Sequence, residues 1–427
     1  MNTPTSIGRI TATLFWGALA PALLLLGCAG PKEFQGFSYD PEGATVTTTK
    51  PIQPQHRRTI GVADQGVWIS NEFEGARMND FYQVDHSLFR VVIEPENHPI
   101  NNSPWYAFKI WSDIPQSIQL ELDYEHGEHR YIPELSHDRS RWTTIDGSSY
   151  QPDTTAGTAL LTLDIGPDTL WVSAQELITG SVMESWIERI ADRPSVRHRI
   201  VGYSHLKNPI HRLTITDAAP SDHRGVVIIT SRQHPPEVTG GLACQIFIDA
   251  LSGESTLARQ FRKHFEVIAY PFMNPDGVNN GHWRHNAGGV DLNRDWIAFN
   301  QPETRSVRRD LFRLKSDTLR TVYYGIDFHS TDENIFYPIS REIKTFPDDF
   351  TYRWLDTLMA AYPGVDFTVE PFDTSSPITK NWIYRTFGAD ALTYEVLDTA
   401  NRDSLKVITG TAAKLLMEML LAERKNI

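Results

Sequence analysis

Hydrophobic residues follow two different patterns along the chain, and the pattern changes near residue 179. Between residues 59 and 178, short runs that alternate or are rich in aromatic residues are separated by clusters of turn-forming residues. Short strands at this spacing are typical of an antiparallel β-sandwich, and we predict one over residues 59–178. Its clearest strands cover residues 89–93, 105–111, 118–124 and 158–165.

Beyond residue 179, strand-like apolar runs alternate with segments of helical periodicity. The first helix carries an apolar stripe from Val182 to Ile190, and Ser181 and Glu184 have the spacing of a capping box at its start. This alternation predicts an α/β domain over residues 179–427, with a mixed, mostly parallel sheet flanked by helices. The predicted strands cover residues 212–215, 226–230, 267–272, 322–328 and 393–396, and the main helices cover residues 238–251, 302–315, 348–361 and 403–424.

The first 27 residues differ from both domains. They contain one charged side chain, Arg9, and an apolar run that Pro21 interrupts, which indicates a secretory signal rather than a transmembrane helix. The run ends in Leu25-Leu26-Gly27-Cys28, which resembles the lipobox of bacterial lipoproteins, so acylation of Cys28 is expected; the alternative is a plain secretion signal with an incidental cysteine. Residues 28–58 are rich in Pro, Thr, Gly and Gln without periodicity and are predicted to be a flexible tether.

The chain is acidic, with a formal net charge of −13. Removal of residues 1–27 would take away Arg9 and no acid, leaving 39 basic and 53 acidic side chains and a net charge of −14. This charge argues against a nucleic-acid partner and against electrostatic adhesion to anionic lipid. If Cys28 is acylated, Cys244 is the one remaining cysteine, so no internal disulfide is possible.

Candidate metal ligands follow two of the predicted buried strands. His234 and Glu237 lie in the turn between the strand at residues 226–230 and the next helix, where an imidazole and a carboxylate three positions apart can converge on one cation. His329 comes directly after the apolar run at residues 322–326. Two histidines and one glutamate suit zinc and leave the fourth tetrahedral position open, as in catalytic rather than structural zinc sites.

The segment between the two histidines, residues 271–296, reads PFMNPDGVNNGHWRHNAGGVDLNRDW. Together with His234-x-x-Glu237, Asp327-Phe-His329 and Thr393-Tyr-Glu395, it resembles the zinc carboxypeptidase family. The nine-residue interval from Arg284 to Asn293 and the preceding β-sandwich resemble most the cytosolic-carboxypeptidase branch and its bacterial relatives.

The resemblance implies one zinc ion per chain, bound by His234, Glu237 and His329. It implies that Asp291 orients the first histidine ligand and fixes its tautomer. Glu395 resembles the general base that takes a proton from zinc-bound water, and Arg284 the group that faces the scissile carbonyl.

Four further residues are assigned to substrate binding. Asn293 and Arg294 resemble the clamp for the terminal carboxylate of the substrate. The segment at residues 379–388 resembles, with imperfect spacing, the substrate-pocket segment of the cytosolic branch. If Lys380 and Arg385 line the pocket for the departing residue, a C-terminal Glu or Asp should be favoured; otherwise both are solvated surface charges.

These observations predict a zinc-dependent carboxypeptidase that hydrolyses C-terminal residues of peptides in the bacterial cell envelope. The alternatives are an amidase or carboxypeptidase acting on peptidoglycan stem peptides, and a non-catalytic envelope protein that binds ligands on the same fold. Ala29 and Gly30 follow Cys28 without an acidic residue that would indicate inner-membrane retention. A lipid anchor in the outer membrane, facing the periplasm or the cell surface, is therefore expected.

Overall fold

The computed structural model describes residue 40, residues 43–371 and residues 374–425. The predicted signal peptide and Cys28 lie outside these residues. The described part of the predicted tether contains no helix or strand, but it is hydrogen bonded to the rest of the chain. The N–H of Lys50 donates to the carbonyl oxygen of Gly288 (2.9 Å), and that of Gln53 donates to the carbonyl oxygen of Glu96 (2.6 Å). These bonds hold this part of the segment against the folded domains.

The β-sandwich consists of two sheets. In order across the first sheet lie β1 (Thr59–Val62), β2 (Val67–Ser70), β5 (Ala107–Ser112), β11 (Leu170–Ser173), β7 (Glu134–Ser136) and β8 (Thr143–Thr144). In order across the second lie β3 (Asp80–Gln83), β4 (Leu88–Ile93), β6 (Gln116–Tyr124), β10 (Thr158–Ile165) and β9 (Tyr150–Asp153).

Alternation of buried and exposed residues accounts for the packing of these sheets. Along β6, Ile118, Leu120 and Leu122 are buried while most intervening polar side chains are not, so one face of the strand enters the core. The sandwich is antiparallel as predicted except for one pair, because β4 and β6 run parallel. Alternation within a strand specifies which face is buried but not the direction of the neighbouring strand, so the sequence pattern could not reveal this pair.

The α/β domain is built on one eight-stranded sheet, and the predicted mostly parallel α/β fold is confirmed. The four central strands, β15, β14, β16 and β19, are parallel and are buried along most of their length. Such strands are continuous apolar runs because both sheet faces are covered. The strand order is β12 (Val196–Tyr203), β13 (Pro209–Ile215), β15 (Phe265–Tyr270), β14 (Arg224–Ser231), β16 (Arg320–Thr331), β19 (Asp390–Leu397), β17 (Ile335–Pro338) and β18 (Thr368–Val369).

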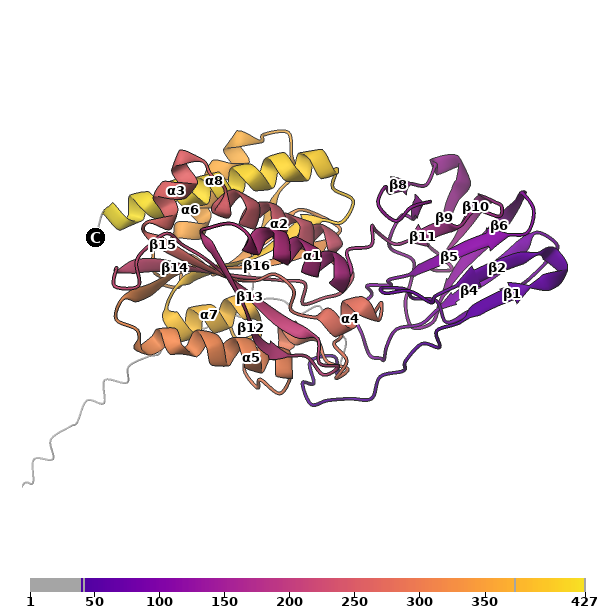
Figure 1. Cartoon of the computed structure of the whole chain (residues 1–427), viewed down its shortest axis with the longest axis horizontal. Helices are drawn as coiled ribbons and strands as arrows, with labels where there is room; N and C mark the ends of the chain where they lie inside the picture. The colour runs from indigo at the N-terminus through magenta and orange to yellow at the C-terminus, as the bar shows by residue number, and fades with distance from the viewer. Residues whose placement is uncertain (1–39, 41–42, 372–373, 426–427) are drawn as a thin grey trace, which may run out of the picture. The chain divides into compact units, whose positions relative to one another are not determined.

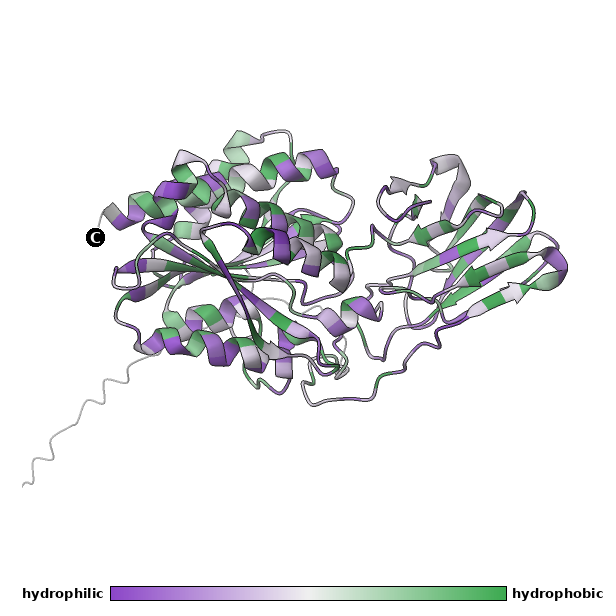
Figure 2. Cartoon of the chain, in the orientation of Figure 1, coloured by the Kyte–Doolittle hydropathy of each residue, from purple (hydrophilic) through white to green (hydrophobic). Residues whose placement is uncertain are grey.

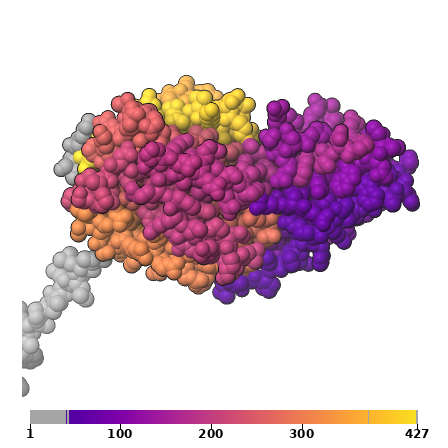
Figure 3. Space-filling view, in the orientation of Figure 1, coloured from indigo at the N-terminus to yellow at the C-terminus, as the bar shows by residue number. Residues whose placement is uncertain are grey.

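Helices cover both faces of this sheet (Figure 1). One face packs against α1 (Gly180–Ala191), α2 (Val238–Ser252), α3 (Thr256–Arg262), α6 (Phe350–Ala361) and α8 (Arg402–Lys425). The other packs against α5 (Pro302–Leu311) and α7 (Thr379–Phe387). The central strands are accordingly green in the hydropathy colouring of Figure 2. In Figure 3, the orange segments that include α5 lie below the magenta first half of this domain.

The start of α1 differs from the predicted capping box. The helix begins at Gly180, and its N-cap residue Thr179 makes no side-chain cap hydrogen bond. Ser181 lies inside the helix, and its hydroxyl donates to the carboxylate of Glu74 (2.6 Å) instead. A hydrogen bond to a residue more than 100 positions away therefore replaces the predicted capping box. Among the described residues, no helix is both long enough and apolar enough to cross a membrane.

A close approach of two backbones joins α2 to β16. Gly240 lies in the first turn of α2, and a Cβ atom at this position would lie 2.4 Å from the carbonyl carbon and oxygen of His329. No side chain can be accommodated there without displacing main-chain atoms. Glycine therefore brings the helix that follows His234 and Glu237 into direct contact with the strand that carries His329.

We expect Gly240→Ala to destabilise the protein by about 1–3 kcal/mol, because the added methyl group overlaps with backbone atoms. Gly410→Ala in α8 is the matched control, since a Cβ atom there meets nothing within 4 Å. The control should stabilise the protein by about 0.5–1 kcal/mol through helix propensity. Urea unfolding of both variants measures the two effects, and equal stabilities would contradict the proposed close contact.

Candidate metal centre and active site

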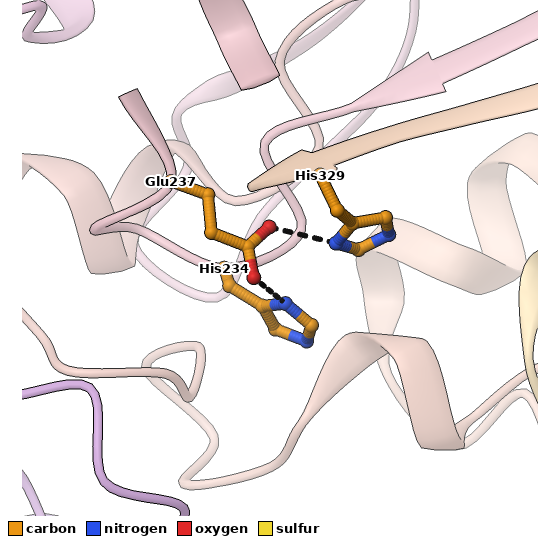
Figure 4. Close-up of side chains that lie close together, drawn as sticks. All are labelled: His234, Glu237 and His329. Carbon is orange, nitrogen blue, oxygen red and sulfur yellow. Dashed lines mark hydrogen bonds and ion pairs between the residues drawn. The ribbon is translucent and has the colours of Figure 1, made fainter. Parts of the chain in front are cut away.

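Three predicted metal ligands come together at the carboxyl ends of β14 and β16. His234 and Glu237 lie in the turn between β14 and α2, and His329 lies near the end of β16. Figure 4 shows both imidazole rings directed at the carboxylate of Glu237. His234 Nδ1 lies 2.6 Å from Glu237 Oε1, and His329 Nδ1 lies 2.7 Å from Glu237 Oε2. One ligand atom from each residue lies within 4.8 Å of the other two.

The outer nitrogen of each imidazole is held by a second carboxylate. His234 Nε2 lies 2.9 Å from Asp291 Oδ1, and His329 Nε2 lies 2.7 Å from Asp327 Oδ2. Carboxylates in this position fix the tautomer and the ring orientation of histidines that bind zinc. The donor set and its support therefore fit a zinc ion bound through the two Nδ1 atoms and the carboxylate of Glu237.

Burial and neighbouring charges shift the pKa values of these ligands in opposite directions. Burial alone would raise the pKa of Glu237, but His234 and His329 outweigh it and hold that pKa well below its usual value. Burial alone would lower the pKa of His329, but Asp327 and Glu237 raise it well above its usual value. The carboxylates thus create a strongly negative environment, which favours a bound cation.

Sequence reasoning assigned no role to Asp327, although the motif that contains it was recognised. The sequence did contain a signal for Asp327, because residues two apart on a strand point to the same face. Asp327 and His329 are two apart on β16, so the carboxylate and the imidazole necessarily share a face.

A cavity of about 160 Å³ opens over the metal ligands. The α/β domain contributes most of its wall, and the β-sandwich and the segment before it contribute the rest. Besides the three ligands, its lining includes the predicted residues Arg284, Asn293, Arg294 and Glu395, together with Asp40, Asn101, Ser103, Arg130, Ser330, Thr331, Tyr337, Ile378 and Thr393.

Glu395 lies beside the metal ligands because β19 pairs with β16 and sets Glu395 directly opposite His329. Its Oε2 atom is shielded from solvent and has no hydrogen-bond partner among the described residues. Burial raises the pKa of Glu395 to about 7, with Glu237 adding to the effect and His329 opposing it. The carboxyl group therefore has an unsatisfied acceptor atom in the same cavity as the three ligands.

Arg284 lies on a loop that the β-sandwich domain holds in place. The fully buried carboxylate of Glu96 accepts hydrogen bonds from three consecutive N–H groups, those of Trp283 (2.7 Å), Arg284 (3.1 Å) and His285 (2.6 Å). The Nε of Arg284 donates to Asp291 Oδ2 (2.7 Å). Asp291 therefore positions both His234 and Arg284. Sequence reasoning did not find Glu96, which lies in a cluster of turn residues almost 190 positions away.

Arg294 and Asn293, the predicted substrate clamp, already have partners. The carboxylate of Asp40 binds the guanidinium of Arg294 through both oxygen atoms, and Oδ1 lies 2.8 Å from Nη2. Burial would raise the pKa of Asp40, but Arg294 outweighs it and lowers that pKa, so Asp40 is ionised. Asn293 Oδ1 accepts from the N–H of Thr379 (3.0 Å), and Asn293 Nδ2 lies 3.2 Å from His329 Nε2.

Lys380 and Arg385, the residues assigned to recognition of an acidic side chain, both lie on α7. Lys380 is buried and its Nζ donates to Asn381 Oδ1 (3.1 Å). Arg385 is exposed and its guanidinium donates to the carbonyl oxygen of Thr374. Neither belongs to the described residues that line the cavity, whereas Arg130 from the β-sandwich does. The Arg130 guanidinium donates to Asp398 Oδ2 (2.7 Å).

Comparison with known proteins agrees with this geometry. The zinc carboxypeptidase family matches residues 183–401, about half of the chain, and the chain belongs to this family. Cytosolic carboxypeptidase 6 of Mus musculus is 31% identical over 136 residues, which cover 30% of this chain and 25% of the relative. The matched region thus spans only about a quarter of that relative.

Solved structures are similar over a longer region. A metallo-carboxypeptidase from Burkholderia cenocepacia has a TM-score of 0.69 at 18% identity and covers 83% of this chain and 99% of its own. The structure of a metallo-carboxypeptidase from Pseudomonas aeruginosa was solved in complex with (2-guanidinoethylmercapto)succinic acid. It has a TM-score of 0.68 at 20% identity and covers 83% of this chain and 99% of its own. These similarities establish that the fold extends over the β-sandwich as well as the α/β domain.

Proposed function

We propose that this protein is a zinc-dependent carboxypeptidase that hydrolyses the last peptide bond of its substrates. The observation that carries the proposal is the convergence of His234, Glu237 and His329 in one cavity with Glu395. A binding protein on the same fold would not require a carboxyl group with an unsatisfied oxygen beside a metal site. An enzyme that must accept a proton there does require it.

A zinc ion held by His234, Glu237 and His329 would supply a Lewis acid and a water molecule of lowered pKa. Glu395 Oε2 is placed to accept a proton in this cavity and would return it to the leaving amine. Asp291 holds the Nε of Arg284, and both Nη groups of Arg284 have no partner among the described residues. These two groups can stabilise the negative charge that develops on the scissile carbonyl oxygen.

Recognition of a free C-terminus is proposed for Arg294. The internal carboxylate of Asp40 occupies the guanidinium fork through both oxygen atoms. This contact supports the proposal, because a C-terminal residue would present the same kind of group, a carboxylate, at the wall of the cavity. The two carboxylates would then compete for one guanidinium group.

One prediction from this proposal separates the proton acceptor from the metal ligands. Glu395→Gln should retain about one zinc per chain and lower kcat by roughly 10²–10⁴, because an amide cannot accept the proton. His329→Ala should lose zinc and activity together. Metal analysis and the release of C-terminal amino acids from a peptide library measure both effects. Glu333→Gln, which removes an exposed carboxylate, is the control, and near-normal kcat in Glu395→Gln would contradict the assignment.

A second prediction concerns competition at Arg294. Asp40→Asn removes the internal negative charge, so KM for peptides with a free C-terminus should fall by about tenfold while kcat changes little. Asp64→Asn, at an exposed position, is the charge-matched control and should leave KM unchanged. A higher KM in Asp40→Asn would indicate that Asp40 orients Arg294 for substrate rather than competing with it.

We also propose that the enzyme is anchored in the bacterial envelope through Cys28, with peptide-like envelope material as its substrate. The support is the sequence Leu25-Leu26-Gly27-Cys28 after an apolar run. Because two or more acyl chains hold a protein stably at a membrane, wild-type protein should require detergent for release from the membrane fraction. Cys28→Ser should be recovered without detergent, and equal recovery of the two proteins would exclude the anchor.

A further inference from the structure

A second hollow, of about 550 Å³, lies in the α/β domain away from the metal centre. We call it the arginine hollow, because six arginines line it. These are Arg197, Arg199, Arg212, Arg224, Arg313 and Arg320. Such a concentration of positive charge is unexpected in a chain whose net charge is −13.

Sheet register gathers these side chains on one face. Arg199 of β12 pairs with Arg212 of β13, and Arg224 of β14 pairs with Arg320 of β16. Residues directly opposite each other on neighbouring strands point to the same side of the sheet. Arg224 and Arg320 are the first residues of their strands, whereas His329 is nine positions further along β16. At 3.3 Å per residue, Arg320 in the arginine hollow is roughly 30 Å from His329 along this strand.

Carboxylates neutralise only part of this charge. Glu266 accepts from Arg224 (2.7 Å), Arg320 (3.3 Å) and Arg212 (3.4 Å). Asp310 contacts Arg199 and Arg212, and Asp317 contacts Arg320. Six guanidinium groups, which stay protonated in proteins, thus face three contacting carboxylates. Three positive charges remain uncompensated.

Several donors in the arginine hollow also have no acceptor. Arg212 is 7% exposed, and its Nε has no hydrogen-bond partner in the described part of the chain. A buried donor without an acceptor is rare in folded proteins and indicates a ligand or solvent that completes the site. Arg197 and Arg313 are exposed at the wall of the hollow, and neither contacts an acidic side chain of the described residues.

We propose that the arginine hollow is a binding site for a phosphate-bearing ligand. Guanidinium forks match the oxygen geometry of phosphate, and the roughly two negative charges of a phosphomonoester would balance most of the uncompensated arginine charge. A single carboxylate would leave most of that charge unbalanced. The volume is sufficient for a small organic phosphate or for the headgroup of a phospholipid. The proposal does not depend on zinc or on peptidase activity.

Pyrophosphate titrated into the full-length protein in a calorimeter tests the site. Wild type should bind it, and Arg197→Ala/Arg313→Ala should bind it at least tenfold more weakly. Both side chains are exposed and outside the ion-pair network, so the double variant should fold normally, which thermal unfolding checks. Arg141→Ala/Arg189→Ala removes two exposed arginines elsewhere and should bind like wild type. Equal affinity in all three proteins, or no binding by wild type, would overturn the proposal.

Sedimentation with vesicles distinguishes the two sources of the phosphate group. Wild type and the Arg197→Ala/Arg313→Ala variant have the same N-terminal region, so any difference between them arises in the arginine hollow. Greater binding of wild type to phosphatidic acid vesicles, but not to phosphatidylcholine vesicles, would identify a lipid headgroup. Pyrophosphate binding without this difference would identify a free phosphate compound. Either result supports a phosphate site.

Discussion

The carboxylate of Glu237, held between two buried imidazoles, is the constraint on which this site depends. His234 and His329 come from different strands, and each must present Nδ1 to the same carboxylate. Asp291 and Asp327 bind the opposite nitrogens, so three carboxylates fix two ring orientations. A buried polar cluster makes a site rigid when every member has a partner, and each of these five side chains has one.

The sheet register extends this constraint to the rest of the cavity. Because β19 pairs with β16, the backbone of Glu395 is held directly opposite that of His329. The close contact of Gly240 with the backbone of His329 holds α2 against the same strand. The metal ligands and the proposed proton acceptor therefore belong to one rigid group of elements. Arg284, by contrast, lies on a loop whose main chain is bound by Glu96. Arg294 ends a short 3-10 helix, and its guanidinium is bound by Asp40.

Local patterns in the sequence predicted most of what depends on neighbouring residues. The apolar runs predicted the central strands. The predicted turn that carries His234 and Glu237 lies where the structure has it, between β14 and α2. Apart from Asp327, what was missed depends on residues far apart in the sequence. Asp40 and Arg294 are separated by 254 positions, and Arg130 and Asp398 by 268, so no periodicity connects them. The direction of β4 relative to β6 and the true start of α1 were likewise decided by tertiary contacts.

The three hydrogen bonds to Glu96 have a consequence for how the two domains can be recombined. A carboxylate from the β-sandwich domain completes the main-chain bonding of a loop that belongs to the α/β domain. An α/β domain separated from its sandwich would leave three adjacent amide groups without their acceptor. The two domains are therefore not interchangeable modules. A chimera that exchanges the sandwich would have to supply an acidic side chain at the same place, or lose the shape of the loop that carries Arg284.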